Sequence, residues 1–385
     1  MIPGMPAGSD ASVGDTRFIG PLRVGVTALV IAHHTAIVYG GSGSWYWREL
    51  PSSGAPSSIA LSLLCAFDQA FFMGLFFLLA GYFTPASLLR RGPRGYLAER
   101  ALRLGLPLLV FGWVIGPMTV ALAATARGQP FWATWARLMA HRDYEPGPLW
   151  FCQALLLLAL AAAVWHVWVR PLRGAEPAAT AAPLPRAASW AWSAAGVGAG
   201  ALLLRQRWPV GSEWGHMQLG YFASYLFLFA LGVAAAPGQW LQRVPPDQAR
   251  RWRRVAWLSF GLLPATGVAF GALHGVKVDY SGGLGLPAIV YAFWEPLVAW
   301  GVMAALLLRF QRRFAQPSPR WQRWSASAYG AFVLHAPVLV AVSLAARPLA
   351  LPALLKWALV ASLSTALAFA LAAALRRLPL VARVM

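Results

Sequence analysis

Charged side chains are scarce in this chain. Only 11% of its 385 residues are Asp, Glu, Lys or Arg, and 59% are hydrophobic, whereas soluble proteins carry about 25% charged residues. This scarcity excludes an ordinary soluble domain. Acidic residues are scarcer than basic ones, 12 against 32, which gives a net charge of +20. Because the basic residues lie mostly in short loops between apolar runs, they indicate a topology signal and contact with anionic lipid, and no nucleic-acid partner.

Cysteine is rare and asparagine is absent. Cys65 and Cys152 lie far apart in apolar surroundings and form no Cys-x-x-Cys pair, which argues against a disulfide framework or a cysteine-based metal site. Without Asn the chain has no N-glycosylation sequon. Residues 1–16 are polar and lack a basic segment followed by an apolar one. We therefore expect no cleaved signal peptide, and we expect the first spanning helix to act as the signal anchor.

Long apolar runs dominate the chain instead. Runs of about 20 residues recur along it, and a helix of this length crosses a bilayer. They predict an all-α, polytopic integral membrane protein with about ten transmembrane helices. We expect a polar tail at 1–16, a single transmembrane domain at 17–376 and a short cytoplasmic tail at 377–385. The predicted spans are 22–39, 62–85, 102–125, 149–169, 190–204, 219–236, 255–273, 287–308, 328–346 and 351–375.

The distribution of arginine orients these spans. Arg pairs such as Arg90-Arg91, Arg250-Arg251 and Arg312-Arg313 fall on the cytoplasmic side if the N-terminus is cytoplasmic, as the excess of basic residues in inner loops requires. Both termini are then expected in the cytoplasm. The predicted outer loops are rich in Trp, which favours an interfacial belt and leaves open a surface that stacks on sugars.

Four ionisable residues lie well inside predicted spans at similar depths. Such residues usually face the interior of a bundle and pair with one another. Histidine can act as a general base, and a carboxylate can orient it and stabilise its charged form. The alternative is four separately satisfied polar groups. The sequence does not decide which of the two acids would partner the first histidine. The four residues are His34, Asp68, Glu295 and His335.

Two further features involve histidine and arginine. His33 points about 100° away from His34 around the helix, so the two cannot face the same cavity wall. Arg100 and Arg103 are three residues apart at a helix start, so they share one face and suit a clamp on phosphate. Anchoring of the helix at the membrane surface is the alternative reading, although Arg103, followed by Leu-Gly-Leu-Pro, lies deep enough to need a partner.

Five motifs occur in a characteristic order. They are Arg23-x10-His34, the segment Phe76 to Phe83, Arg100-x-x-Arg103, Leu149-Trp150-Phe151, and Tyr329 to His335. Across residues 17–346 this order resembles the type-3 membrane acyltransferase family, the bacterial integral-membrane O-acyltransferases of surface and periplasmic glycans. The chain departs from the family pattern in three places, where Gly20-Pro21, Ala80 and Ala328 stand in place of Leu-Asp, Ser and Ser.

The resemblance implies transfer of an acyl group, acetyl first and succinyl as a possibility, from cytoplasmic acyl-CoA to a hydroxyl of an extracytoplasmic glycan or other acceptor. It places the chain in the bacterial inner membrane as a stand-alone member without a fused esterase-like domain. Acyl-CoA would be a co-substrate, with no permanently bound cofactor and no metal.

The same resemblance assigns residue roles. His34 would be the essential histidine and Arg23 its paired arginine, with Asp68, Glu295 and His335 as further catalytic candidates. Arg100 and Arg103 would hold the acyl donor, and Trp150 and Tyr329 would contact substrate. His34 would act as a general base or, alternatively, carry the acyl group covalently.

Two other classes of protein compete with an enzyme. Intramembrane His, Asp and Glu are also typical of a proton-coupled secondary transporter, although the sequence shows no visible inverted repeat. A scaffold subunit of a polysaccharide export system is the third interpretation, and it predicts that His34 is dispensable.

Overall fold

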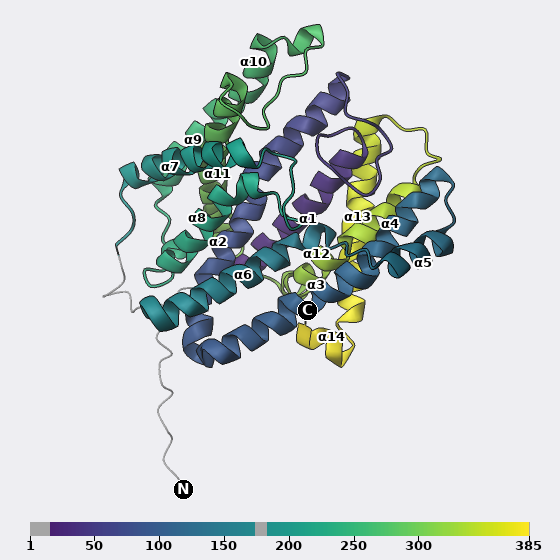
Figure 1. Ribbon diagram of the computed structural model, residues 1–385. Coiled ribbons are helices and arrows are strands. Elements are labelled where there is room, and N and C mark those ends of the chain that lie inside the picture. Colours follow the sequence, from purple (N-terminus) through teal and green to yellow (C-terminus); the bar gives the residue numbers. More distant parts are fainter. Residues whose placement is uncertain (1–15, 174–182, 385) are drawn as a thin grey trace.

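The computed structural model describes residues 16–173 and 183–384. This part of the chain is built from helices and has no strand, only two isolated β-bridges. The all-α prediction is therefore confirmed (Figure 1). The predicted tail at 1–16 lies almost wholly outside the described residues, as does 174–182 of the loop before the fifth predicted span.

The α-helices run in chain order as α1 (Ile19–Val38), α2 (Pro56–Arg100), α3 (Leu106–Val110), α4 (Gly116–Ala124), α5 (Phe131–His141), α6 (Trp150–Val164), α7 (Ala187–Arg207), α8 (Phe222–Ala235), α9 (Pro246–Phe260), α10 (Leu262–Ala269), α11 (Leu286–Arg313), α12 (Pro319–Ala345), α13 (Ala353–Leu375) and α14 (Pro379–Val384). Three short π-helical segments adjoin these helices. They are η1 (Ala101–Gly105), η2 (Phe111–Ile115) and η5 (Trp165–Val169).

Seven helices in the described residues are long and apolar enough to cross a membrane. One of them, Pro56–Arg127, contains two of the ten predicted spans. It is broken at Gly92, whose φ of 67° is not helical, and Figure 1 shows the second arm leaving the foot of α2 and rising towards α4. The predicted span at 219–236 forms the shorter helix α8, and the one at 255–273 is divided at Gly261 between α9 and α10. The number ten stays a prediction.

Small residues allow the central helices to approach closely. A Cβ atom at Gly81 of α2 would lie 2.1 Å from the carbonyl oxygen of Phe229 in α8, and one at Gly232 would lie 2.2 Å from that of Leu78. Such pairs of small residues are typical of helix packing in membranes, where close backbone contact replaces the hydrophobic drive. They bring α8 directly against α2.

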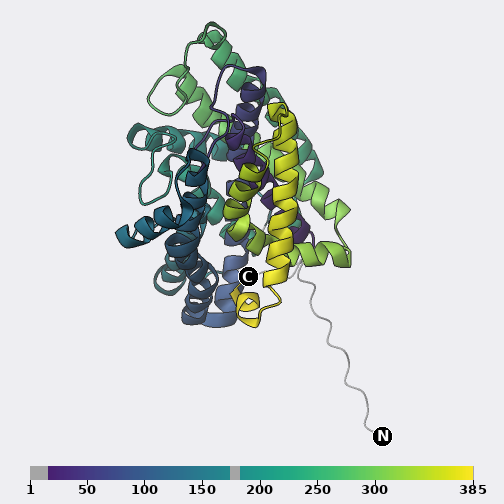
Figure 2. The same cartoon turned by 90° about the vertical axis from the view of Figure 1, so that its right-hand side faces the viewer.

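Both described ends of the chain lie at one end of the bundle. Gly20 of α1 packs on Ser325 near the start of α12, and Trp324 packs on Phe369 near the end of α13. Figure 2 shows α13 running the height of the bundle down to α14. This end also carries Arg23, Arg100 and Arg103, and we call it the arginine end.

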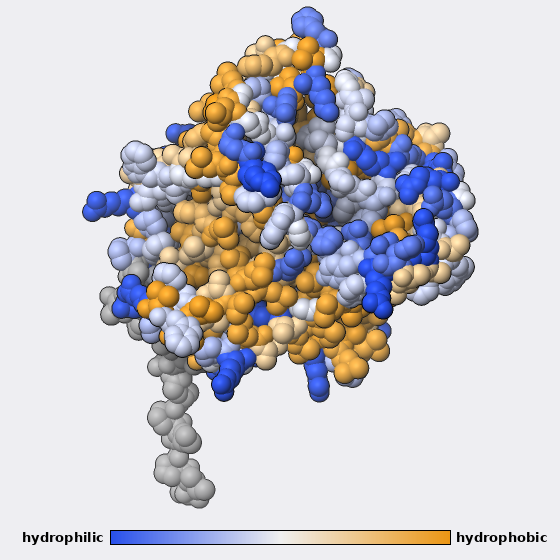
Figure 3. All heavy atoms as spheres, in the orientation of Figure 1, coloured by the Kyte–Doolittle hydropathy of each residue, from blue (hydrophilic) through white to orange (hydrophobic). Residues whose placement is uncertain are grey.

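The surface of the bundle is apolar over a broad band. In Figure 3 hydrophobic side chains cover the middle of the face, and polar ones gather at the right of the view, over α4 and α5. Exposed leucines include Leu109, Leu157, Leu203 and Leu258. Large exposed apolar patches are rare on proteins that face water. This band of exposed hydrophobic side chains therefore belongs against lipid. The fold is that of a multi-pass membrane protein.

Candidate active site

Two histidines and a tryptophan stack in the interior. The ring of His34 lies 4.0 Å from that of Trp45 at 19°, and 5.3 Å from that of His335 at 18°. His34 comes from α1, His335 from α12 and Trp45 from the loop after α1. The structure thus brings together the two predicted histidines. His34 is half-buried whereas His33 is buried, so His34 is the more accessible of the pair.

The loop that carries Trp45 is held firmly. The backbone N–H groups of Glu49 and Leu50 both donate to the carbonyl of Val38, at 2.9 and 3.1 Å. Glu49 forms an ion pair with the buried Lys356 of α13, and Ser58 donates to the carbonyl of Gly40 at 2.6 Å. These contacts fix Trp45 over His34.

His335 has a defined protonation pattern. Its Nδ1 lies 2.5 Å from the carbonyl oxygen of Phe332, and only a protonated Nδ1 can make that hydrogen bond. The neutral ring then offers Nε2 as an acceptor, and this atom is buried with no hydrogen-bond partner among the described residues. His34 Nδ1 is likewise buried and unpartnered there. The site therefore contains two nitrogen atoms free to handle a proton.

Asp68 takes His33 as its partner. Its Oδ2 lies 3.8 Å from His33 Nδ1, and both groups are buried. The rings of His33 and His34 meet edge to face at 5.3 Å. Asp68 therefore faces His33, which packs beside His34, and the sequence did not indicate this arrangement.

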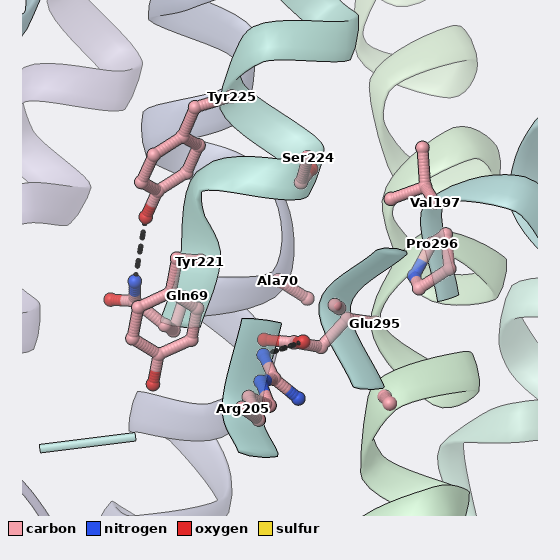
Figure 4. A pocket seen from close by; sticks show the side chains of 11 residues that line it. Gln69, Ala70, Val197, Arg205, Tyr221, Ser224, Tyr225, Glu295 and Pro296 are labelled. Atoms are coloured by element: carbon pink, nitrogen blue, oxygen red, sulfur yellow. Dashed lines mark hydrogen bonds and ion pairs between the residues drawn. The ribbon is translucent and has the colours of Figure 1, made fainter. Parts of the chain in front are cut away.

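Glu295 belongs to a second polar centre. Its carboxylate forms an ion pair with Arg205 of α7, whose side chain is 1% exposed. The guanidinium lies between the rings of Tyr221 and Tyr291, 5.3 and 4.9 Å from their centroids. Figure 4 shows this pair beside Gln69, which donates to Tyr225 at 2.9 Å. The expectation that Glu295 would join the histidines is thus corrected: a buried carboxylate needs a cation, and Arg205 supplies it.

The sequence did not single out Arg205. It stands at the end of an apolar run, where arginine ordinarily anchors a helix at the membrane surface. Glu295 could have indicated it, because a carboxylate buried in the membrane needs a positively charged partner.

Arg23 and His34 lie on the same side of α1. Eleven residues correspond to about three turns of helix, so the two side chains share one face about 16 Å apart. Arg23 is half-buried and lies close enough to Arg103 and Tyr329 to interact with them electrostatically. The spacing therefore connects the arginine end to the histidines along one wall.

A π-helical turn shapes the arginine end. Arg103 lies in η1, and its carbonyl oxygen accepts a hydrogen bond from the hydroxyl of Tyr329 at 2.6 Å. Single π-turns leave backbone groups without their usual partners and are frequent at functional sites. The predicted substrate contact Tyr329 thus acts on the backbone of a predicted donor-binding arginine.

A groove opens beside these residues. It has a volume of about 520 Å³ and is lined by Arg91, Glu99, Arg103 and Arg383, among others. Glu99 forms ion pairs with Arg91 at 3.1 Å and with Arg103 at 3.5 Å. Arg100 does not line this groove. It lies over the ring of Tyr96 at 5.1 Å, and its Nε is buried without a partner in the described chain. The groove is rich in guanidinium groups that match phosphate in shape and charge.

Trp150, the other predicted substrate contact, lies in an aromatic cluster. It stacks on Tyr225 at 5.7 Å and 25° and approaches Phe77 at 6.4 Å. It is half-buried. Its visible contacts are those of core packing.

Comparison with known proteins identifies the family. The family model for type-3 acyltransferases, described as an acyltransferase domain, matches residues 19–377. No curated protein matches the chain, and no solved structure does. The match covers essentially all of the helices described above. The chain therefore belongs to the type-3 acyltransferase family, and it is a membrane acyltransferase.

Proposed function

We propose that the protein transfers an acyl group from acyl-CoA, bound at the arginine end, to a hydroxyl of an extracytoplasmic acceptor such as a glycan. The arginine end then faces the cytoplasm, both termini are cytoplasmic, and the ten predicted spans cross the bacterial inner membrane. Acetyl is the first choice of acyl group and succinyl the second. The observation that carries the proposal is the alignment of Arg23 and His34 along one face of α1, between a guanidinium-rich groove and a stack of histidines.

The donor binds through its phosphates. Arg100 and Arg103 offer planar guanidinium groups, which pair with phosphate through two hydrogen bonds at once. Arg103 must exchange part of its pairing with Glu99 for the donor. The long thioester arm then follows α1 towards His34, so that the acyl carbon lies within reach of the histidine.

His34 acts as the general base. It takes the proton from the acceptor hydroxyl while the oxygen forms a bond to the acyl carbon, and the carbon–sulfur bond of the thioester breaks. The proton then passes to the leaving thiolate of CoA. Asp68 lies 3.8 Å from His33, whose ring meets that of His34. The negative charge of Asp68 close to the base favours the charged form of His34 that this step creates.

Trp45 and His335 complete the setting of His34. The rings of Trp45 and His335 lie next to His34 and next to each other, 5.8 Å apart, so the three rings form one cluster. This cluster holds the imidazole in place and limits the access of water, which would otherwise compete for the acyl group. His335 Nε2 provides a second acceptor nearby.

One experiment tests the function directly. Surface and periplasmic glycans are extracted from cells with and without the gene and compared by mass spectrometry. We expect an ester of defined mass to be lost with the gene and restored by the wild-type chain. Identical glycans in both strains, together with acyl-CoA-independent solute flux, would contradict the proposal in favour of the carrier interpretation, which the comparisons do not support.

A smaller effect is expected from Tyr329→Phe. Loss of the hydroxyl frees the Arg103 carbonyl and loosens η1, so the KM for acyl-CoA should rise about threefold to tenfold, as for loss of one neutral hydrogen bond of about 1 kcal/mol. The acceptor KM should not change. Ser362→Ala, which removes an exposed hydroxyl on α13, serves as the control. An unchanged KM for acyl-CoA would show that Tyr329 does not position the donor site.

A further inference from the structure

Ring contacts continue from His34 towards the end of the bundle opposite the arginine end. Trp45, stacked on His34, meets Tyr46 edge to face at 5.1 Å. The Tyr46 hydroxyl lies against Gly147, where a Cβ atom would be only 1.8 Å away. Gly147 also has a φ of 45°, which favours glycine. The first loop and the loop after α5 are therefore fitted together at this point.

Exposure increases along the same line. His335 is fully buried, His34, Trp45 and Tyr46 are half-buried, and His216 at the far end is exposed. His216 packs edge to face on Tyr144 at 5.6 Å. Three loops, after α1, after α5 and after α7, thus meet above the histidine stack. The line from His216 to His34 leads from the exposed surface to the base.

Glu145 is fixed in the middle of this line. Its backbone N–H donates to the carbonyl of Gly112 at 2.9 Å, and its own carbonyl lies where a Cβ of Gly116 would be, 2.0 Å away. These two glycines, one helical turn apart, let the backbone of the loop dock on η2 and α4. The Glu145 side chain is consequently held in place.

Polar atoms of Glu145 and Tyr46 can form more hydrogen bonds than they do in the described part of the chain. Glu145 Oε1 accepts one hydrogen bond, from the N–H of Gly147 at 3.1 Å. The Tyr46 hydroxyl is buried without a hydrogen-bond partner in the described part of the chain. Burial raises the pKa of Tyr46 well above its ordinary value, with nearby Glu145 acting in the same direction, so the phenol keeps its proton and can donate. Burial also raises the pKa of Glu145, opposed by the Gly147 N–H and by His216.

We propose that Tyr46, Glu145 and His216 form the acceptor subsite, which binds a hydroxyl-rich, sugar-like molecule and directs one hydroxyl to His34. This proposal rests on the proposed function. The carboxylate accepts from a sugar hydroxyl, the phenol donates to a sugar oxygen, and the rings of Tyr46 and Tyr144 offer apolar faces to its C–H groups. An unpartnered buried hydroxyl is costly, and the acceptor satisfies it.

The test separates donor from acceptor. The protein in lipid nanodiscs is supplied with acetyl-CoA and, as acceptor probe, the unacylated glycan fraction from cells lacking the gene. Glu145→Gln and Tyr46→Phe should each raise the KM for the glycan fraction about tenfold and leave the KM for acetyl-CoA unchanged. Asp143→Asn is the matched control, since it removes an exposed carboxylate two residues away on the same loop, and both KM values should stay at the wild-type level.

The outcomes are distinguishable. If the wild-type chain transfers acetyl groups and Glu145→Gln keeps the wild-type glycan KM, the subsite is wrong and the proposed function stands. If both KM values change together with a lower melting temperature, Glu145 is structural and the subsite is again wrong. If the wild-type chain transfers nothing to the glycan fraction, the proposed function itself fails.

Discussion

Replacing His34 with alanine is expected to reduce acyl transfer by about 10²- to 10⁴-fold, the usual contribution of a general base. The imidazole is the only half-buried histidine of the stack, and it packs against both Trp45 and His335. Its removal takes the proton acceptor from the reaction without touching the arginine end. We expect acyl-CoA binding to persist. CoA release in the presence of acceptor, measured on purified protein, gives the rate.

Two controls accompany this variant. His274→Ala changes an exposed histidine in the loop after α10 and should keep the wild-type rate. His33→Ala should give an intermediate loss, because it removes the ring that packs against both Asp68 and His34 and leaves the base in place. A His34→Ala protein that inserts normally and transfers at the wild-type rate would rule out His34 as the base.

Membrane physics explains why His34 and His335 could be found from the sequence. An ionisable group in a run of apolar residues has few options, because lipid does not solvate it. Both residues therefore had to face the interior, and similar depth in their helices made a meeting plausible. The same reasoning gives the all-α fold, since a helix satisfies its own backbone in lipid.

The sequence could not assign partners to the acids. Helices such as α1 and α11 are apolar on nearly every side, so periodicity does not reveal which face turns to which neighbour. The rotation of α11 decides that Glu295 meets Arg205, and the rotation of α2 decides that Asp68 meets His33. Both depend on packing between helices distant in sequence.

Trp45 escaped prediction for a different reason. A tryptophan in a loop beside a membrane helix ordinarily belongs to the interfacial belt. Here the ion pair of Glu49 with Lys356 and the hydrogen bonds to Val38 fold the loop inward. Lys356 lies 307 residues further along the chain than Glu49, and no local pattern reveals a contact of this range.

Arg205→Ala is expected to be the most destabilising single change, with a loss of about 3–5 kcal/mol in the free energy of unfolding, as for removal of one partner from a buried ion pair. It leaves the Glu295 carboxylate without a cation in a buried site, and it also removes the donor to the carbonyl of Gly220, 3.1 Å away. The contact between α7, α8 and α11 weakens as a result. Unfolding in lipid nanodiscs, followed by circular dichroism, measures the effect.

The double variant Arg205→Met/Glu295→Leu distinguishes the causes. Replacing both members of a buried ion pair with apolar side chains of similar size is often nearly neutral, so most of the lost stability should return. Arg207→Ala, which removes the next arginine on α7, two residues further on, where the side chain is exposed, should cost less than 1 kcal/mol, as surface substitutions generally do. An equally unstable double variant would mean that the guanidinium acts mainly through Gly220, Tyr221 and Tyr291. In that case Arg205 would stabilise the packing of the helices mainly through these three contacts, and its ion pair with Glu295 would contribute little.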